Sequence, residues 1–501
     1  MVWTDGRNGT DYNIFAQRID ANGSVQWTLD GIPICAAPFN QEYPVIASDG
    51  AGGAMITWQD RRNGAGADIY AQHVDASGLV QWTADGIAIC TAASDQWSPE
   101  IIGDGAGTAI ITWEDNRSGA GLDIYAQRLN SSGAILWMAN GVPICSAIDS
   151  QRYPVVVGDG TGGAIVTWED WRNLTAVDIY AQRVDASGNT QWPQDGVAIS
   201  ISTNNQFDPV ISGDGAGGAV IAWNDDRVNW LTRDIYAQRI DATGTVQWMA
   251  NGIGICTAAL GQTAPAIISD GAGGSIIAWD DARATGGNLN IYAQRVDPAG
   301  VAQWVPDGVA LTMAVDEQVS PAITGDGTGG ALVVWVDRRS STEGDIYAQR
   351  IDAAGMVQWT MDGVAVCTVA EPQLLSALVG DGAGGAIIAW EDGRDATNNP
   401  EVFAQLIGGN GVLGQVGTSI GASDALAIPT SSRGFPNPAV DVLHIADMRY
   451  TSGVVLITDI PGRLVAQPRM TNGAVDVHDL APGIYVAHLP PHATSVRFVK
   501  E

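Results

Sequence analysis

The chain has 501 residues, of which 46% are hydrophobic and 16% charged, so it is long and apolar enough to bury a large core. Its 55 aspartates and glutamates outnumber the 24 lysines and arginines, and the net charge of −31 excludes a protein that grips nucleic acid through a basic surface. No stretch is long and apolar enough to predict a membrane-spanning helix.

A tryptophan recurs every 55 or 56 residues along most of the chain. Its eight occurrences are Trp3, Trp58, Trp113, Trp168, Trp223, Trp279, Trp335 and Trp390. Each one begins a pentad of the form Trp-x-Asp-x-Arg. A fixed period of this length is typical of a repeat architecture, in which every copy is one structural unit.

Each period contains four blocks, separated by turns rich in Gly, Asp and Ser. In chain order they are a Gln-x-x-Pro block such as Gln151–Pro154, an apolar run that leads into the pentad such as Ala109–Trp113, a Tyr-containing block such as Asp123–Arg128, and a Cys-containing block such as Gly86–Cys90. A second tryptophan series, for example Trp82, precedes the Cys block. The runs are short, rich in Val, Ile, Trp and Tyr, and lack a helical period, which predicts strands.

The predicted strands are apolar on both faces, so their sheets must be covered on both sides. Four-stranded sheets packed around an axis satisfy this requirement, and we predict an all-β protein with a β-propeller of about eight four-stranded blades over residues 1–417. The first copy is incomplete. Seven blades remain the alternative, because the strand that begins with this glutamine occurs seven times, six times as Gln-x-x-Pro and once as Gln373-Leu-Leu-Ser. A β-solenoid is disfavoured, since its coils usually repeat at shorter periods.

The repeat ends near residue 417. Residues 418–434 read as a linker, and residues 435–501 as a small all-β domain of short strands and Pro/Gly turns. An ordered set of motifs runs through this last segment: Phe-Pro-Asn-Pro, Gly-Arg-Leu-Val, Gly-Ile-Tyr and a basic end. The residues that carry it are Pro436, Asn437, Pro438, Gly462, Arg463, Gly483, Tyr485 and Lys500.

This set resembles the C-terminal sorting domain of the type IX secretion system (Por secretion) family, and the repeats resemble bacterial surface β-propellers. The resemblance implies that residues 435–501 form a small β-sandwich, which acts as the signal for export across the outer membrane of a Bacteroidota-type bacterium, with the secretion machinery as its partner. It places the protein outside the cell or on its surface. Such cargo needs an N-terminal export signal, and none precedes the first repeat, so we expect the natural N-terminus to lie upstream.

The pentad has two interpretations: a ring of acidic sites for a metal or substrate, or a structural lattice in which a ladder of Asp–Arg pairs ties blade to blade. We favour the lattice, because a residue present in every copy is most simply structural. Its clearest members are Trp58, Asp60, Arg62, Trp113, Asp115, Arg117, Trp168, Asp170 and Arg172. The sequence predicts no catalytic triad, metal site or cofactor, although calcium binding and paired-carboxylate chemistry stay open.

Function is expected where the copies differ. In an up-and-down blade, the loops after the pentads and the loops that carry Gln-x-x-Pro share one rim. The candidate ligand-binding residues on that rim are Trp97, Trp171, Trp230, Tyr43, Tyr153 and Phe207. They either bind a glycan or protein by stacking or cap the strand ends.

We therefore predict a monomeric, cell-surface-associated propeller that acts as a non-catalytic binding or adhesion module. The alternatives are a polysaccharide-active hydrolase or lyase, which would need asymmetric carboxylates in the central channel, and a purely structural surface protein.

Overall fold

The computed structural model divides the chain into two compact units, Met1–Ser423 and Asp424–Glu501. In the first unit it describes residues 1–21, 23–64, 66–228, 232–284, 287–340, 344–394 and 401–414. In the second it describes residues 434–435, 442–445, 452–459, 464–466, 468–471, 474–481, 483–489 and 494–500. Every regular element in these ranges is a strand. No helix that could cross a membrane occurs in them.

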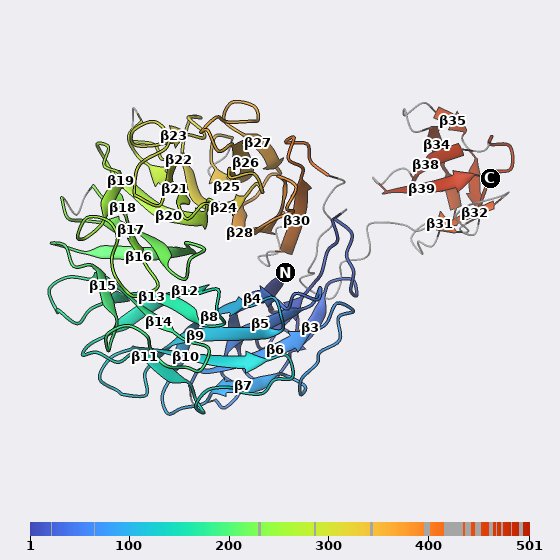
Figure 1. The fold of residues 1–501 in the computed structure, drawn as a ribbon. Helices are drawn as coiled ribbons and strands as arrows, with labels where there is room; N and C mark the ends of the chain where they lie inside the picture. The colour runs from blue at the N-terminus through green and yellow to red at the C-terminus, as the bar shows by residue number, and fades with distance from the viewer. Residues whose placement is uncertain are drawn as a thin grey trace. The chain divides into compact units, whose positions relative to one another are not determined.

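The first unit consists of eight antiparallel sheets, which are the blades of a β-propeller (Figure 1). Blade 1 contains β1 (Val2–Asp5), β2 (Asn13–Ala16) and β3 (Ile32–Cys35); blade 2 contains β4 (Gln41–Ser48), β5 (Ala54–Asp60), β6 (Asp68–Val74) and β7 (Ile87–Cys90); blade 3 contains β8 (Gln96–Gly103), β9 (Thr108–Asp115), β10 (Asp123–Asn130) and β11 (Val142–Cys145); blade 4 contains β12 (Gln151–Gly158), β13 (Ala164–Asp170), β14 (Asp178–Val184) and β15 (Val197–Ser200).

The remaining blades repeat the pattern. Blade 5 contains β16 (Gln206–Gly213), β17 (Ala219–Asp225), β18 (Asp234–Ile240) and β19 (Ile253–Cys256); blade 6 contains β20 (Gln262–Ser269), β21 (Ser275–Asp281), β22 (Asn290–Val296) and β23 (Val309–Ala310); blade 7 contains β24 (Gln318–Gly325), β25 (Ala331–Asp337), β26 (Asp345–Ile351) and β27 (Val364–Cys367); blade 8 contains β28 (Gln373–Gly380), β29 (Ala386–Asp392) and β30 (Glu401–Ile407).

The Gln-x-x-Pro strand is the innermost strand of each blade from blade 2 onward. The strand order is Gln strand, pentad strand, Tyr strand, Cys strand, each antiparallel to the next. The Gln strands β8, β12 and β16 lie toward the middle of the ring, and the Cys strands β11, β15 and β19 lie outside (Figure 1). This order puts the pentad loops and the starts of the Gln strands on one rim, which we call the loop rim. The Asp-Gly turns lie on the opposite, turn rim.

The first tryptophan series fills the core of the blades, and in blades 1 to 7 a glycine makes room for the ring. Gly86 has φ +84°, and a Cβ there would lie 2.6 Å from the Trp58 ring and 2.6 Å from the carbonyl oxygen of Ala71. The second series occupies turns beyond the Tyr strands. The indole Nε1 of Trp82 donates to the carbonyl of Ser131 in the next blade at 2.9 Å. Both tryptophans of the period are therefore structural.

Apolar side chains from adjacent blades form one core cluster at each seam. Between blades 2 and 3, for example, Met55 and Ile69 share a cluster with Trp113. The last seam joins the two ends of the ring, because Ala389 and Ala404 of blade 8 share a cluster with Met1 of blade 1. Eight blades with an incomplete first blade are thus confirmed, and the seven-bladed alternative is wrong.

The second unit contains two antiparallel sheets, with the orders β31-β32-β37-β36-β33 and β35-β34-β38-β39. Its strands are β31 (Gly434–Phe435), β32 (Val442–Ile445), β33 (Ser452–Val454), β34 (Leu456–Asp459), β35 (Leu464–Ala466), β36 (Arg469–Thr471), β37 (Ala474–Asp476), β38 (Gly483–Leu489) and β39 (Thr494–Lys500). The all-β fold of this segment is as predicted, while the packing of its sheets into a sandwich stays a prediction.

Candidate functional site

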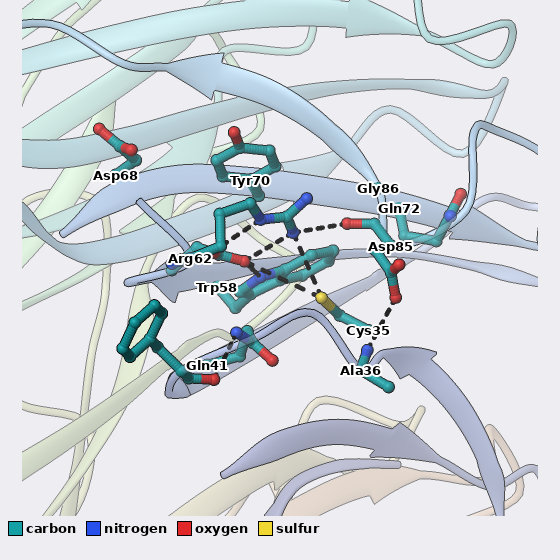
Figure 2. Close-up of polar contacts among 12 residues, drawn as sticks. Cys35, Ala36, Gln41, Trp58, Arg62, Asp68, Tyr70, Gln72, Asp85 and Gly86 are labelled. Atoms are coloured by element: carbon teal, nitrogen blue, oxygen red, sulfur yellow. Dashed lines mark hydrogen bonds and ion pairs between the residues drawn. The ribbon is translucent and has the colours of Figure 1, made fainter. Parts of the chain in front are cut away.

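The pentad forms a closed polar network, shown for blade 2 in Figure 2. The carboxylate of Asp60 is fully buried and accepts bonds from Trp58 Nε1 at 2.7 Å and from Nε and Nη2 of Arg62 at 2.9 and 2.7 Å. Arg62 Nη2 also reaches the carbonyl oxygen of Asp85 at 2.7 Å and Sγ of Cys35, in blade 1, at 3.3 Å. The Asp–Arg pair therefore lies within one blade, and the cysteine connects it to the neighbouring blade.

The same network recurs around the ring, and its carboxylates and thiols are buried. The pentad aspartates Asp115 and Asp170 are fully buried against Arg117 and Arg172, as is Asp60 against Arg62. All five cysteines are free and buried. Burial raises the pKa of four of these thiols to about 12, namely Cys35, Cys90, Cys145 and Cys256. Neither the aspartates nor the thiols are placed for catalysis.

Aromatic side chains that are exposed gather on the loop rim. Among the described residues the exposed aromatics are Tyr12, Phe39, Tyr43, Tyr153 and Trp171, and all five lie on this rim. Of the predicted residues, Tyr43, Tyr153 and Trp171 expose 68%, 54% and 41% of their surface. Trp97 and Phe207 are half-buried, and Trp230 lies outside the described residues.

Two members of the rim, Tyr12 and Phe39, extend the aromatic set to blade 1 and were not predicted. Their exposure depends on loop conformation. Phe39 has φ +63°, a left-handed conformation that no sequence pattern signals for phenylalanine. Tyr12 stands between the pentad and the Tyr strand, next to Gly6.

A β-bulge near the start of each Gln strand turns one side chain outward. In blade 4 the pairing of β12 with β13 shifts between Arg152 and Val155, and Tyr153 has φ +52°. The Tyr153 N–H donates to Oε1 of Glu114 in blade 3 at 2.7 Å. The bulge is thus anchored to the preceding blade, and Tyr153 is held outward rather than folded over the strand end.

Blade 4 carries a pocket of about 240 Å³ on the loop rim. It is lined by Asp149, Ser150, Arg152, Trp171 and Leu174. Trp171 directly follows β13, and its N–H donates to the carbonyl oxygen of Ser150 at 2.9 Å. The pairing of β12 with β13 therefore places Trp171 beside the residues that begin β12. These residues lie about 20 positions apart in the sequence, so this contact was not predicted.

The pocket contains two charged groups whose side chains make no hydrogen bond and no close ion pair with the described residues. Among the described residues of the propeller, Arg152 is the one arginine whose side chain makes neither a hydrogen bond nor an ion pair, and it is exposed. Within the same ranges the carboxylate of Asp149 accepts no hydrogen bond and joins no ion pair. Two groups of opposite charge thus stay available to a ligand beside an indole ring.

Carboxyl groups with raised pKa values form a second asymmetric feature, on the inner part of the ring. Burial raises the pKa of Glu169 to about 7, and the charges of Asp208 and Glu114 add to the effect. Burial alone raises the pKa of Glu100 to about 7. Glu100 occupies an inner-strand position that holds Val or Ala in every other copy. In the described ranges no group of three or more His, Cys, Asp or Glu is arranged to hold a metal ion.

Comparison with known families identifies the C-terminal unit. Residues 434–499 match the model of the secretion system C-terminal sorting domain. The molecule is therefore an exported β-propeller protein with a C-terminal sorting domain of the type IX system, destined for the cell surface or the extracellular space. The secretion machinery is accordingly a partner of this segment. Of the predicted signal residues, Gly483 and Tyr485 lie in β38 and Lys500 lies in β39. Pro436, Asn437, Pro438, Gly462 and Arg463 lie outside the described residues.

Known structures resemble the propeller only distantly, and no curated protein matches the chain. A PL25 ulvan lyase has a TM-score of 0.47 at 11% identity, over 72% of this chain and 90% of its own. The α-L-arabinanase of Penicillium chrysogenum has a TM-score of 0.36 at 13% identity, over 64% of this chain and 94% of its own. The endo-arabinase of Bacteroides thetaiotaomicron has a TM-score of 0.31 at 17% identity, over 53% of this chain and 94% of its own.

Proposed function

We propose that this protein is a non-catalytic binding module for an extracellular glycan, which it holds on the loop rim of the propeller. The observation that carries the proposal is the restriction of all exposed aromatics in the described residues to that rim. An exposed aromatic ring costs solvation free energy, and five on one face indicate a surface kept for a ligand.

The shape of the rim supports binding rather than packing. If Tyr43 and Tyr153 capped the strand ends, their rings would be covered by the chain, yet both remain more than half exposed. The bulge itself belongs to the scaffold, because Ser98, Asp208, Ala264 and Ser320 share the left-handed conformation of Tyr43 and Tyr153 at this repeat position. What differs between the copies is the side chain that the bulge turns outward, and an exposed tyrosine ring there offers a stacking surface.

The export signal fits the same role, because the molecule works where polysaccharides and foreign surfaces are found. Adhesion through a protein partner would use the same rim, and a monomer would suffice for either ligand. Calcium would be an added requirement only if ligand binding responded to chelators.

Affinity electrophoresis of the full chain in gels that contain soluble polysaccharides tests this proposal. Trp171→Ala should abolish retardation without lowering Tm, because Trp171 is exposed on the rim. The matched control is Arg338→Ala, at the same repeat position in blade 7, which should bind as the parent does. The proposal fails if no polysaccharide retards the parent protein, or if Trp171→Ala lowers Tm and binding together.

A polysaccharide-active enzyme is the second candidate, and the carboxyl groups favour it. Glu114 and Glu169 stand at the same position of adjacent blades, and burial raises the pKa of each. A carboxyl group with a pKa near 7 can act as a general acid at neutral pH. Each, however, already accepts a backbone N–H of the next blade, from Tyr153 and Asp208, which gives it a structural task as well.

Release of reducing ends, or of unsaturated products, from a polysaccharide panel tests the enzymatic candidate. Activity that disappears in Glu169→Gln and persists in Glu391→Gln, at the equivalent position of blade 8, would establish it and displace the binding proposal. Absence of product from every polysaccharide that the parent binds would remove it.

A further inference from the structure

We infer that the blade-4 pocket is a subsite for one uncharged pyranose ring, so that the glycan is a neutral polysaccharide. This inference rests on the proposed function, and it names the ligand class and the residues that recognise it. The pocket combines Trp171, Arg152 and Asp149, a set that no other blade repeats at the corresponding positions.

Trp171 supplies the stacking surface. The face of an indole is electron-rich and attracts the positively polarised C–H groups on the flat side of a sugar ring. The residue stands in a fixed turn, since the N–H of Leu174 donates to the Trp171 carbonyl at 3.0 Å. The following loop is held by Asn173, whose side chain donates to Asp178 at 2.6 Å and accepts the N–H of Thr175 at 3.0 Å. A ring held this way loses little conformational entropy on binding.

Arg152 and Asp149 supply the hydrogen bonds. A sugar hydroxyl both donates and accepts. A guanidinium can only donate and an ionised carboxylate can only accept, so the two residues together satisfy neighbouring hydroxyls of one ring. Neither side chain makes a hydrogen bond or a close ion pair with the described residues, and the two form no ion pair with each other.

The charge of the site favours a neutral ligand. One cation and one carboxylate line the pocket, so its own charges cancel. Glu114 and Glu169 lie within electrostatic reach of Arg152, as the effect of Arg152 on both of their pKa values shows. The whole chain carries −31. A polyanionic glycan that approached Arg152 would therefore be repelled by these nearby carboxyl groups and by the negative charge of the whole chain.

The size of the pocket favours a single ring. Its volume of about 240 Å³ lies below the roughly 300–1,000 Å³ of pockets that enclose a drug-sized ligand. One sugar unit fits, and the rest of the chain extends along the rim, where Tyr153 lies directly after Arg152 in β12.

Isothermal titration of the full chain tests the inference. The probes are neutral oligosaccharides built of pyranose rings (cello-, xylo-, manno- and galacto-oligosaccharides) and two polyanions, polygalacturonate and chondroitin sulfate. At least one neutral probe should bind with an affinity that is unchanged between 50 and 500 mM NaCl (roughly a threefold change in Debye length). Trp171→Ala and Arg152→Ala should each weaken it by about tenfold or more. Thr263→Ala, at the Arg152 position of blade 6, should leave it unchanged.

Preferential binding of a polyanion, weakened by salt and by Trp171→Ala, would overturn the neutral class while preserving the proposed function. Neutral binding that survives Trp171→Ala and Arg152→Ala but is lost in Tyr43→Ala would overturn the site and again preserve the function. Binding to no probe at all would overturn both.

Discussion

Glu100 is the most exceptional residue of the inner strands, and replacing it by valine should stabilise the propeller. The same position holds valine in blades 2, 4 and 5, where Val45 and Val210 pack into the clusters that join each blade to the next. By the same geometry Glu100 faces the seam between blades 3 and 4. No hydrogen bond or ion pair from the described residues reaches its carboxyl group. Its partner across the strand pair, Thr112, is buried with an Oγ1 that also has no partner.

The pKa sets the magnitude. Burial raises the pKa of Glu100 from its ordinary 4.5 to about 7, so the folded state holds the proton over a pH range in which the unfolded state has released it. Stability is therefore lost as pH rises from about 4.5 to 7, and the full cost at pH 8 is about 3 kcal/mol at 1.36 kcal/mol per unit. A domain of 150–250 residues shifts its Tm by about 2–4 °C per kcal/mol, and a propeller of roughly twice that size should shift by about half as much. Glu100→Val should therefore raise Tm by about 3–6 °C at pH 8.

Differential scanning calorimetry at a fixed scan rate, at pH 8 and pH 5, checks this expectation. The gain should be large at pH 8 and shrink to below about 1 kcal/mol at pH 5, where the folded group is protonated. Glu100→Gln should reproduce most of the effect, because it removes the charge and keeps the size. Val155→Glu should impose the reverse effect on blade 4. A fall in Tm for Glu100→Val at pH 8, or an equal gain at both pH values, would refute the reasoning.

Three further predictions concern the scaffold. Gly86→Ala should lower Tm sharply, because the new Cβ would lie 2.6 Å from the Trp58 ring. Gly160→Ala is the control: Gly160 also has a positive φ, +74°, but open space around it, so this substitution should cost only about 1 kcal/mol. Equal losses of Tm in calorimetry would argue against steric overlap with Trp58 as the cause. Ellman's reagent should titrate no thiol in the native protein and five after denaturation, and any fast-reacting native thiol would contradict the burial of the cysteines. His73→Arg should raise Tm in calorimetry, because four other blades pair an arginine with the equivalent aspartate; an unchanged or lower Tm would contradict this.

Asp49 shows why the substituted pair matters. Burial alone would raise the pKa of Asp49, but bonds from the side chain of His73 and from the N–H groups of Ala51 and Gly53 hold it below its ordinary value. A lowered pKa stabilises the fold above the unfolded value and loses this contribution as pH falls. An arginine at residue 73 would keep a charged donor beside Asp49, because a guanidinium stays protonated.

The fold could be predicted because the pentad that marks each blade recurs eight times in the sequence. A single Trp-x-Asp-x-Arg is weak evidence, but its recurrence at 55 or 56 residues fixes strand order, turn positions and the incomplete first blade together. The site on the loop rim was harder to predict from the sequence. Trp171 is visible in the sequence as a tryptophan outside both series, but its neighbours Arg152 and Asp149 are ordinary residues there. They become notable only when strand register shows that they share a pocket and when every other arginine of the described propeller is seen to have a partner.

Glu100 also stands out in the sequence, although only aromatic exceptions were predicted to be functional. Aligned with the equivalent residues of the other copies, it is the one charged side chain in a column of Val and Ala. The same comparison distinguishes the two candidate functions. If Glu100 serves catalysis, Glu100→Val will gain stability and lose turnover, which is the usual relation between a strained functional group and its scaffold. If the protein only binds, Glu100→Val will gain stability and keep its affinity for the glycan, because the residue stands on an inner strand and Trp171 on the loop rim. Measuring Tm, binding and product release on this one variant therefore separates an active-site carboxyl from an unfavourable buried charge.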